Sequence, residues 1–117
     1  MSLLQTPTTR RFTHALQPIV DVVTRTSFAH EALIRSTNGG GAQTVLSGLT
    51  GHRLHAVDRA SGLQAIALAA RIGMSSCLSI NVLPRSVDGE EHAAALALAT
   101  TTSGFPISKL ILEVTEK

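Results

Sequence analysis

Residues 12–35, FTHALQPIVDVVTRTSFAHEALIR, contain two strand-forming runs joined by a short polar turn. The first run covers residues 12–22 and the second covers residues 28–35, with the turn TRTS between them. Pro18 has no amide hydrogen to donate to a neighbouring strand, so the first strand should lie at a sheet edge or end at a bulge. This stretch predicts an antiparallel hairpin.

After the hairpin the spacing of apolar residues changes from that of strands to that of a helix. Residues 36–43, STNGGGAQ, read as a flexible loop. Apolar residues then recur at three- and four-residue intervals between residues 54 and 70, which predicts a helix that ends at Gly73. Residues 77–83, CLSINVL, form a short apolar strand that stops at Pro84.

A second helix and strand complete the pattern. Residues 89–103 predict a helix, and Asp88 followed by Glu91 resembles a capping box at its start. Residues 109–116, KLILEVTE, are a strand. Strands that alternate with helices after a hairpin are typical of βα units on a parallel sheet. The sequence therefore predicts an α/β fold whose sheet is all parallel after residue 27.

The composition excludes several classes of protein. The chain has 117 residues, 44% of them hydrophobic and 15% charged, so one domain is expected, and the chain is too apolar for disorder. Its apolar stretches are too short to cross a bilayer. A net charge of +2 and an aromatic content of 3% give no basis for binding a nucleic-acid polymer.

The same data suggest where the protein resides. The single cysteine, Cys77, excludes an internal disulfide and fits a reducing compartment. Residues 1–11 form a polar leader without the pattern of a secretory signal, so we expect a cytoplasmic protein with no membrane partner.

Each of the three predicted parallel strands carries one oxygen-bearing side chain in its C-terminal half. These side chains are Glu31, Asn81 and Glu113. Side by side, two carboxylates and an amide oxygen would suit Mg²⁺ or Mn²⁺. Arg35, at a strand end, suits a phosphate because its planar guanidinium can hold two oxygens at once. The alternative is that these residues are solvated at the rim of the sheet, and spacing alone does not decide between the two.

Other motifs are weaker. His30-Glu31 begins like a zinc-protease motif, but Ile34 stands where the second histidine would fall. The glycines of residues 38–42 lack the Gly-Lys-Ser/Thr ending of a phosphate-binding loop.

Three motifs in order resemble the EAL domain, the phosphodiesterase of the bacterial second messenger cyclic di-GMP. They are LQPIVDVVTRTSFAHEALIR at 16–35, LSINVLPRSV at 78–87 and LILEVTEK at 110–117. The resemblance implies a TIM-like (βα)8 barrel with an antiparallel first strand. It also implies that Glu31, Asn81 and Glu113 coordinate a divalent metal.

The resemblance assigns further roles at the same site. Arg35 would contact a phosphate of cyclic di-GMP, Gln17 and Leu33 would line its pocket, and Glu116 would brace a neighbouring loop.

The resemblance covers about half of such a barrel. We therefore expect residues 12–117 to be a truncated EAL-like domain, the N-terminal half of the barrel. The family's later Asp-Asp-Phe-Gly loop and its water-orienting lysine are not among these residues, so the chain alone should not hydrolyse cyclic di-GMP. The alternative is a non-catalytic module that binds a nucleotide or a protein. Its open half-barrel predicts a homo-oligomer or pairing with a missing C-terminal half.

Overall fold

The structure, a computed structural model, describes residues 11–84 and 90–114, and its first feature is the predicted hairpin. Strand β1 (Phe12–Asp21) pairs antiparallel with β2 (Thr26–Ser36). In the turn, Asp21 Oδ1 accepts hydrogen bonds from the backbone amides of Val23, at 2.9 Å, and of Thr24, at 3.3 Å. This is how an aspartate favours a turn over a longer strand.

Both expectations about Pro18 are confirmed. The sheet has the order β1-β2-β3-β4, so β1 lies at its edge, and the register shifts between Ile19 and Val20, immediately after the proline. An edge strand tolerates a residue without an amide hydrogen because one side of its backbone needs no partner strand.

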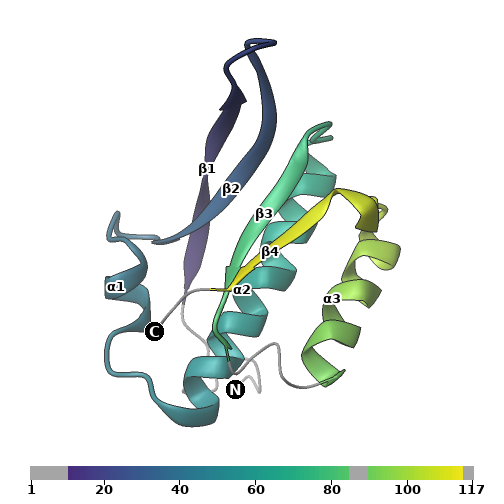
Figure 1. The fold of residues 1–117 in the computed structure, drawn as a ribbon. Coiled ribbons are helices and arrows are strands. Elements are labelled where there is room, and N and C mark those ends of the chain that lie inside the picture. Colours follow the sequence, from purple (N-terminus) through teal and green to yellow (C-terminus); the bar gives the residue numbers. More distant parts are fainter. Residues whose placement is uncertain (1–10, 85–89, 115–117) are drawn as a thin grey trace.

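Strands β2, β3 (Cys77–Val82) and β4 (Leu110–Val114) are parallel, as predicted. Figure 1 shows the hairpin extending beyond the other strands, with β4 at the opposite side of the sheet. Within the described residues the sheet is open, and its two edges are β1 and β4. The α/β prediction is confirmed, and the four described strands do not close into a barrel.

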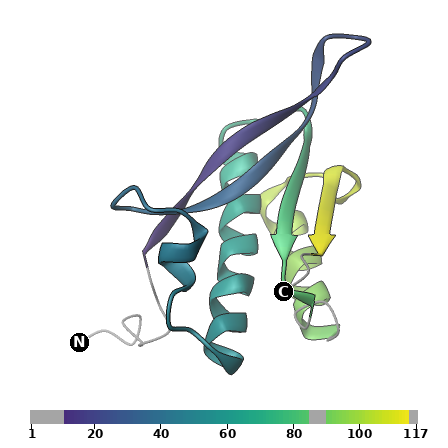
Figure 2. The ribbon, with the colours of Figure 1, turned by 60° about the vertical axis from the view of Figure 1, so that its left-hand side comes forward.

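Two long helices connect the parallel strands and lie on one face of the sheet (Figure 2). Helix α2 (Gly51–Arg71) precedes β3, and α3 (Glu90–Ser103) leads through a 3-10 turn, η2 (Ile107–Lys109), into β4. Gly73 ends α2 as predicted, with φ of 69°. Its amide donates to Ala70 O, and the next amide, of Met74, donates to Ala69 O. This pairing satisfies the last carbonyls of the helix.

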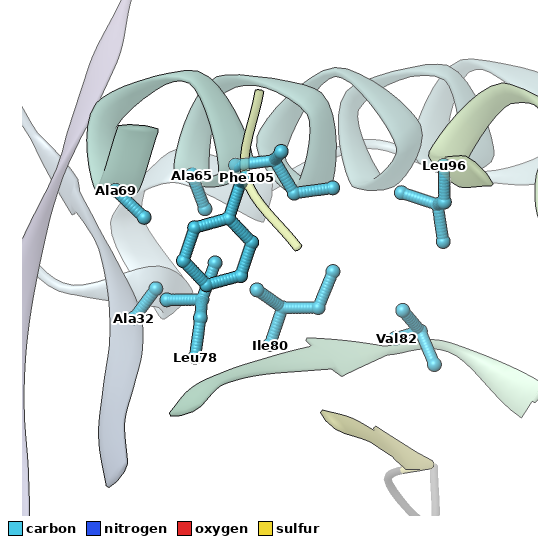
Figure 3. Close-up of a cluster of buried hydrophobic side chains, with 9 residues drawn as sticks. Ala32, Ala65, Ala69, Leu78, Ile80, Val82, Leu96 and Phe105 are labelled. Atoms are coloured by element: carbon cyan, nitrogen blue, oxygen red, sulfur yellow. The ribbon is translucent and has the colours of Figure 1, made fainter. Parts of the chain in front are cut away.

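The core fills the space between these helices and the sheet. Leu78, Ile80 and Val82 of β3 are 0–2% exposed and face Ala65 of α2 and Phe105 (Figure 3). Ile66 of α2 belongs to the same buried cluster. Aliphatic residues and alanines supply most of this core. Because successive side chains of a strand point to opposite faces, Ser79 and Asn81 of β3 lie on the face away from the helices.

One expected loop is partly a helix. Residues 36–43 were predicted to be flexible, but α1 (Ala42–Leu46) begins within them. Its Val45 is buried with Leu49 and Val57 in a second small cluster that the end of β2 also joins through Ile34. Tertiary burial of Val45 stabilises a turn whose local sequence favours a loop.

Some expectations fall outside the described residues. These are the leader over residues 1–10, the Asp88 half of the capping box, and Glu116. Over the described ranges, no helix combines the length and the hydropathy needed to cross a bilayer.

Candidate metal and nucleotide site

The three predicted metal-binding residues lie on adjacent parallel strands and on the same face of the sheet. In the register, Glu31 of β2 is paired with Ser79 of β3, and Asn81 of β3 is paired with Glu113 of β4. Neighbouring strands are about 4.8 Å apart, so this register brings the three side chains within reach of one another.

Two side-chain hydrogen bonds cross this face diagonally. Asn81 Nδ2 donates to Glu31 Oε2 at 2.9 Å. Ser79 Oγ donates to Glu113 Oε1 at 2.7 Å. Each carboxylate is therefore held through one of its oxygens by a donor from the central strand.

The free oxygens fit a hard divalent cation. Because Asn81 gives its amide nitrogen to Glu31, its amide oxygen faces away from that bond. Among the described residues, neither this oxygen nor the second oxygen of Glu31 or of Glu113 has a hydrogen-bond partner. Oxygen ligands of this kind are the ones that Mg²⁺ and Mn²⁺ take.

The donor set is small. Within residues 11–84 and 90–114 no group of three His, Cys, Asp or Glu side chains could hold a metal ion. A metal ion bound here would need the amide oxygen of Asn81 as its third protein ligand, and it would keep positions for water or phosphate oxygens.

The predicted nucleotide-binding residues share the same face. Gln17 of β1 lies directly opposite Glu31 and is exposed, while Leu33 and Arg35 follow Glu31 at two-residue intervals. Arg35 is half-buried, and its Nη1 donates to the backbone oxygen of Ile34 at 3.0 Å. This bond uses one of five guanidinium hydrogens and leaves the others for an anion.

The roles of two residues in this region were not predicted from the sequence. Ser79 is 1% exposed, and its hydroxyl orients the Glu113 carboxylate. The sequence signal for this role was that Ser79 lies two residues before Asn81 and therefore on the same face of β3. The second residue is Asp58 of α2. It is half-buried, and its Oδ2 accepts a hydrogen bond from the backbone amide of Leu83, after β3, at 3.1 Å. No local pattern identifies that contact, because it joins residues 25 positions apart.

Solved structures of EAL proteins match this chain. A standalone versatile EAL protein from Vibrio cholerae O395, in its c-di-GMP-bound form, matches with a TM-score of 0.84 and 37% identity. That match covers 92% of this chain and 46% of the Vibrio chain.

A second set of matches comes from BlrP1 of Klebsiella pneumoniae. Its manganese/cy-diGMP complex at pH 9.0 gives a TM-score of 0.81 at 27% identity, over 99% of this chain and 29% of that one. Its calcium/cy-diGMP complex gives a TM-score of 0.82 at 27% identity, over 99% and 30%. No protein-family profile and no curated protein sequence matches the chain.

The chain spans less than half the length of these solved relatives. Its described strands match the N-terminal portion of their barrels. In this chain the first strand is antiparallel, as the resemblance predicts. By motif order, topology and structural match, the chain is similar to the N-terminal portion of EAL domains.

Proposed function

We propose that this chain carries the first metal-binding half of an EAL-type cyclic di-GMP site. Glu31, Asn81 and Glu113 would hold the divalent cation. The observation that carries the proposal is the pair of crossing hydrogen bonds, which leaves one ligand oxygen of each of these residues available. The crystallised relatives in complex with cyclic di-GMP and manganese or calcium support it.

The chemistry assigned to each residue follows from its groups. A divalent cation would supply Lewis acidity at a phosphodiester oxygen. Arg35 would bind the same phosphate through two parallel N–H donors, and Leu33 and Gln17 would bound the nucleotide pocket. Ser79 would keep the Glu113 carboxylate in its ligating orientation.

We propose binding rather than turnover for this chain by itself, with Mg²⁺ or Mn²⁺ as the cation. The described face offers three oxygen ligands, and the one lysine among the described residues, Lys109, donates to the backbone oxygen of Ser75. A reducing, cytoplasmic setting fits the half-buried free thiol of Cys77.

The test is calorimetric titration of cyclic di-GMP into the full chain with MgCl₂ or MnCl₂ present. We expect metal-dependent binding that is lost in Glu31→Ala. The matched control is Glu91→Ala, which removes a carboxylate from α3 that is 90% exposed. Equal binding by wild type and Glu31→Ala, or binding unaffected by EDTA, would refute the proposed site. Linear dinucleotide that disappears in Glu31→Ala would show that the chain is itself catalytic.

A second function is favoured by the open sheet. Strand β1 and strand β4 each have an edge that no strand pairs within the described residues. Leu112 and Val114 of β4 are 39% and 54% exposed. We propose that these surfaces mediate association, either with a second copy or with the remaining part of an EAL domain. In that case the chain would act as a binding module.

A further inference from the structure

A cavity of about 320 Å³ lies where β2 and β3 separate, on the side of the sheet that the helices cover. The pairing of these strands ends at Ala32 and Ile80, although β2 continues to Ser36. Helices α1 and α2 close the gap that the diverging strands leave. The cavity therefore lies behind the candidate metal site and on the other side of the sheet from its carboxylates.

The walls of this cavity are mostly apolar. Ile34, Leu46, Ala65 and Val82 come from four different elements and line it. A dry apolar cavity of about 150 Å³ is large enough for benzene. This space is larger, so its volume suits a molecule built on one substituted ring.

Most polar groups in the walls already have partners. Asp58 accepts from the Leu83 amide, Asn81 donates to Glu31, and Arg35 donates to the Ile34 carbonyl. Arg35 and Asp58 contribute one positive and one negative charge, so the cavity suits a neutral ligand better than an ion.

The remaining polar pair is His14 and Ser61, whose Nε2 and Oγ atoms are 3.0 Å apart. Among the described residues, the buried Nδ1 of His14 has no partner. A buried N–H without an acceptor is rarer than an acceptor without a donor. The hydrogen-bond pattern therefore assigns the imidazole hydrogen to Nε2, which donates to Ser61 Oγ. The Ser61 hydroxyl hydrogen is then free to be donated elsewhere.

We propose that this cavity is a binding site for a small, neutral, ring-containing molecule that carries one hydrogen-bond acceptor, and that the Ser61 hydroxyl donates to that acceptor. The cavity lies on the opposite side of the sheet from the carboxylates of Glu31 and Glu113. Leu33, Arg35 and Asn81 line it as well, so an occupant would lie against three residues of the metal-binding face.

The test uses two probes of nearly equal size, acetophenone and ethylbenzene, which differ in the carbonyl oxygen. Each is titrated into the full chain without metal or cyclic di-GMP, and backbone amide NMR shifts are recorded. The result is therefore independent of the proposed nucleotide site. We expect saturable shifts around Ser61, Ala65 and Leu83, with acetophenone binding about fivefold more tightly because of one hydrogen bond.

Variants locate the acceptor contact. Ser61→Ala should lower the affinity for acetophenone to that for ethylbenzene and leave the latter unchanged. Ser108→Ala, at an exposed serine outside the cavity, should change neither. Absence of saturable shifts at the cavity overturns the proposal, and so does equal binding of the two probes to the wild type. The second comparison needs no variant and remains decisive if Ser61→Ala does not fold.

Discussion

Ser79 shows how one buried hydroxyl can control a surface carboxylate. It is 1% exposed, and its Oγ lies 2.7 Å from Glu113 Oε1. Residues that orient metal ligands typically contribute 10- to 100-fold in metal affinity. We expect Ser79→Ala to weaken Mn²⁺ binding about tenfold while the stability of the fold changes by about 1 kcal/mol.

Calorimetric Mn²⁺ titration and urea unfolding measure these two effects separately. Ser47→Ala, at an exposed serine, is the control and should alter neither quantity. Unchanged Mn²⁺ affinity in Ser79→Ala would mean that Glu113 needs no orienting partner.

The buried imidazole of His14 should make the stability of the fold depend on pH. Burial lowers the pKa of its imidazole below the ordinary value of 6.5. The unfolded chain therefore binds more protons than the folded chain in the window below 6.5, and stability should fall as the pH falls through that window. Burial also lowers the pKa of His92, which adds a dependence of the same sign.

We expect His14→Gln, which can still donate to Ser61, to reduce the loss of stability between pH 7.5 and about pH 5.5 without removing it. Urea midpoints at several pH values measure this. His52→Gln, at an exposed position on α2, should behave as the wild type does. An identical pH slope in His14→Gln would show that His14 is not responsible.

At the scale of the elements, the sequence predicts those features of the helices and strands that depend on neighbouring residues alone. Pro18 places β1 at an edge, and alternation along β3 places Asn81 on the polar face. The short helix α1 was missed because its stability comes from burial of Val45 against residues far along the chain. The Ser79–Glu113 bond was missed because it depends on the relative register of β3 and β4, which neither strand encodes alone.

Helix α2 packs closely at Gly62. A Cβ atom there would lie 3.1 Å from Leu96 Cδ2 and 3.3 Å from Ile80 Cδ1. Gly62→Val would force extra methyl groups into the contact between α2, α3 and β3. We expect it to lower the free energy of unfolding by about 1–3 kcal/mol.

The control is Ala60→Val on the exposed side of the same helix, which should cost no more than about 0.7 kcal/mol of helix propensity. Thermal and urea unfolding provide the comparison. If the two variants lose equal stability, helix propensity rather than packing explains the effect.

At the scale of the whole molecule, the hydrophobic core and the candidate site lie on opposite faces of the sheet. One face of the sheet is covered by α2 and α3 and holds the core, while the other presents the candidate ligands. The arrangement of Glu31, Asn81 and Glu113 could be predicted from strand alternation and motif order. The cavity could not, because it arises where two strands diverge and residues from five elements meet.

The open sheet gives the last prediction. Unpaired strand edges and exposed apolar residues favour association, because another strand can complete the backbone hydrogen bonds. We expect light scattering on purified chain at micromolar concentrations to give a mass above the 12.3 kDa of one copy. Leu112→Lys with Val114→Lys places two charges on β4 and should return the chain to the monomer. Val22→Lys with Val23→Lys adds the same charges at the hairpin turn, where both valines are more than 80% exposed, and should leave the mass unchanged.

The two double variants distinguish the surfaces involved. If the hairpin pair restores the monomer and the β4 pair does not, the hairpin turn is the contact. A 12.3 kDa monomer for wild type over the whole concentration range would contradict self-association. In that case, adding the remaining part of an EAL domain as a separate chain should give a one-to-one complex. Because barrel closure needs a strand against β4, the β4 pair should weaken that complex too, whereas the hairpin pair should not.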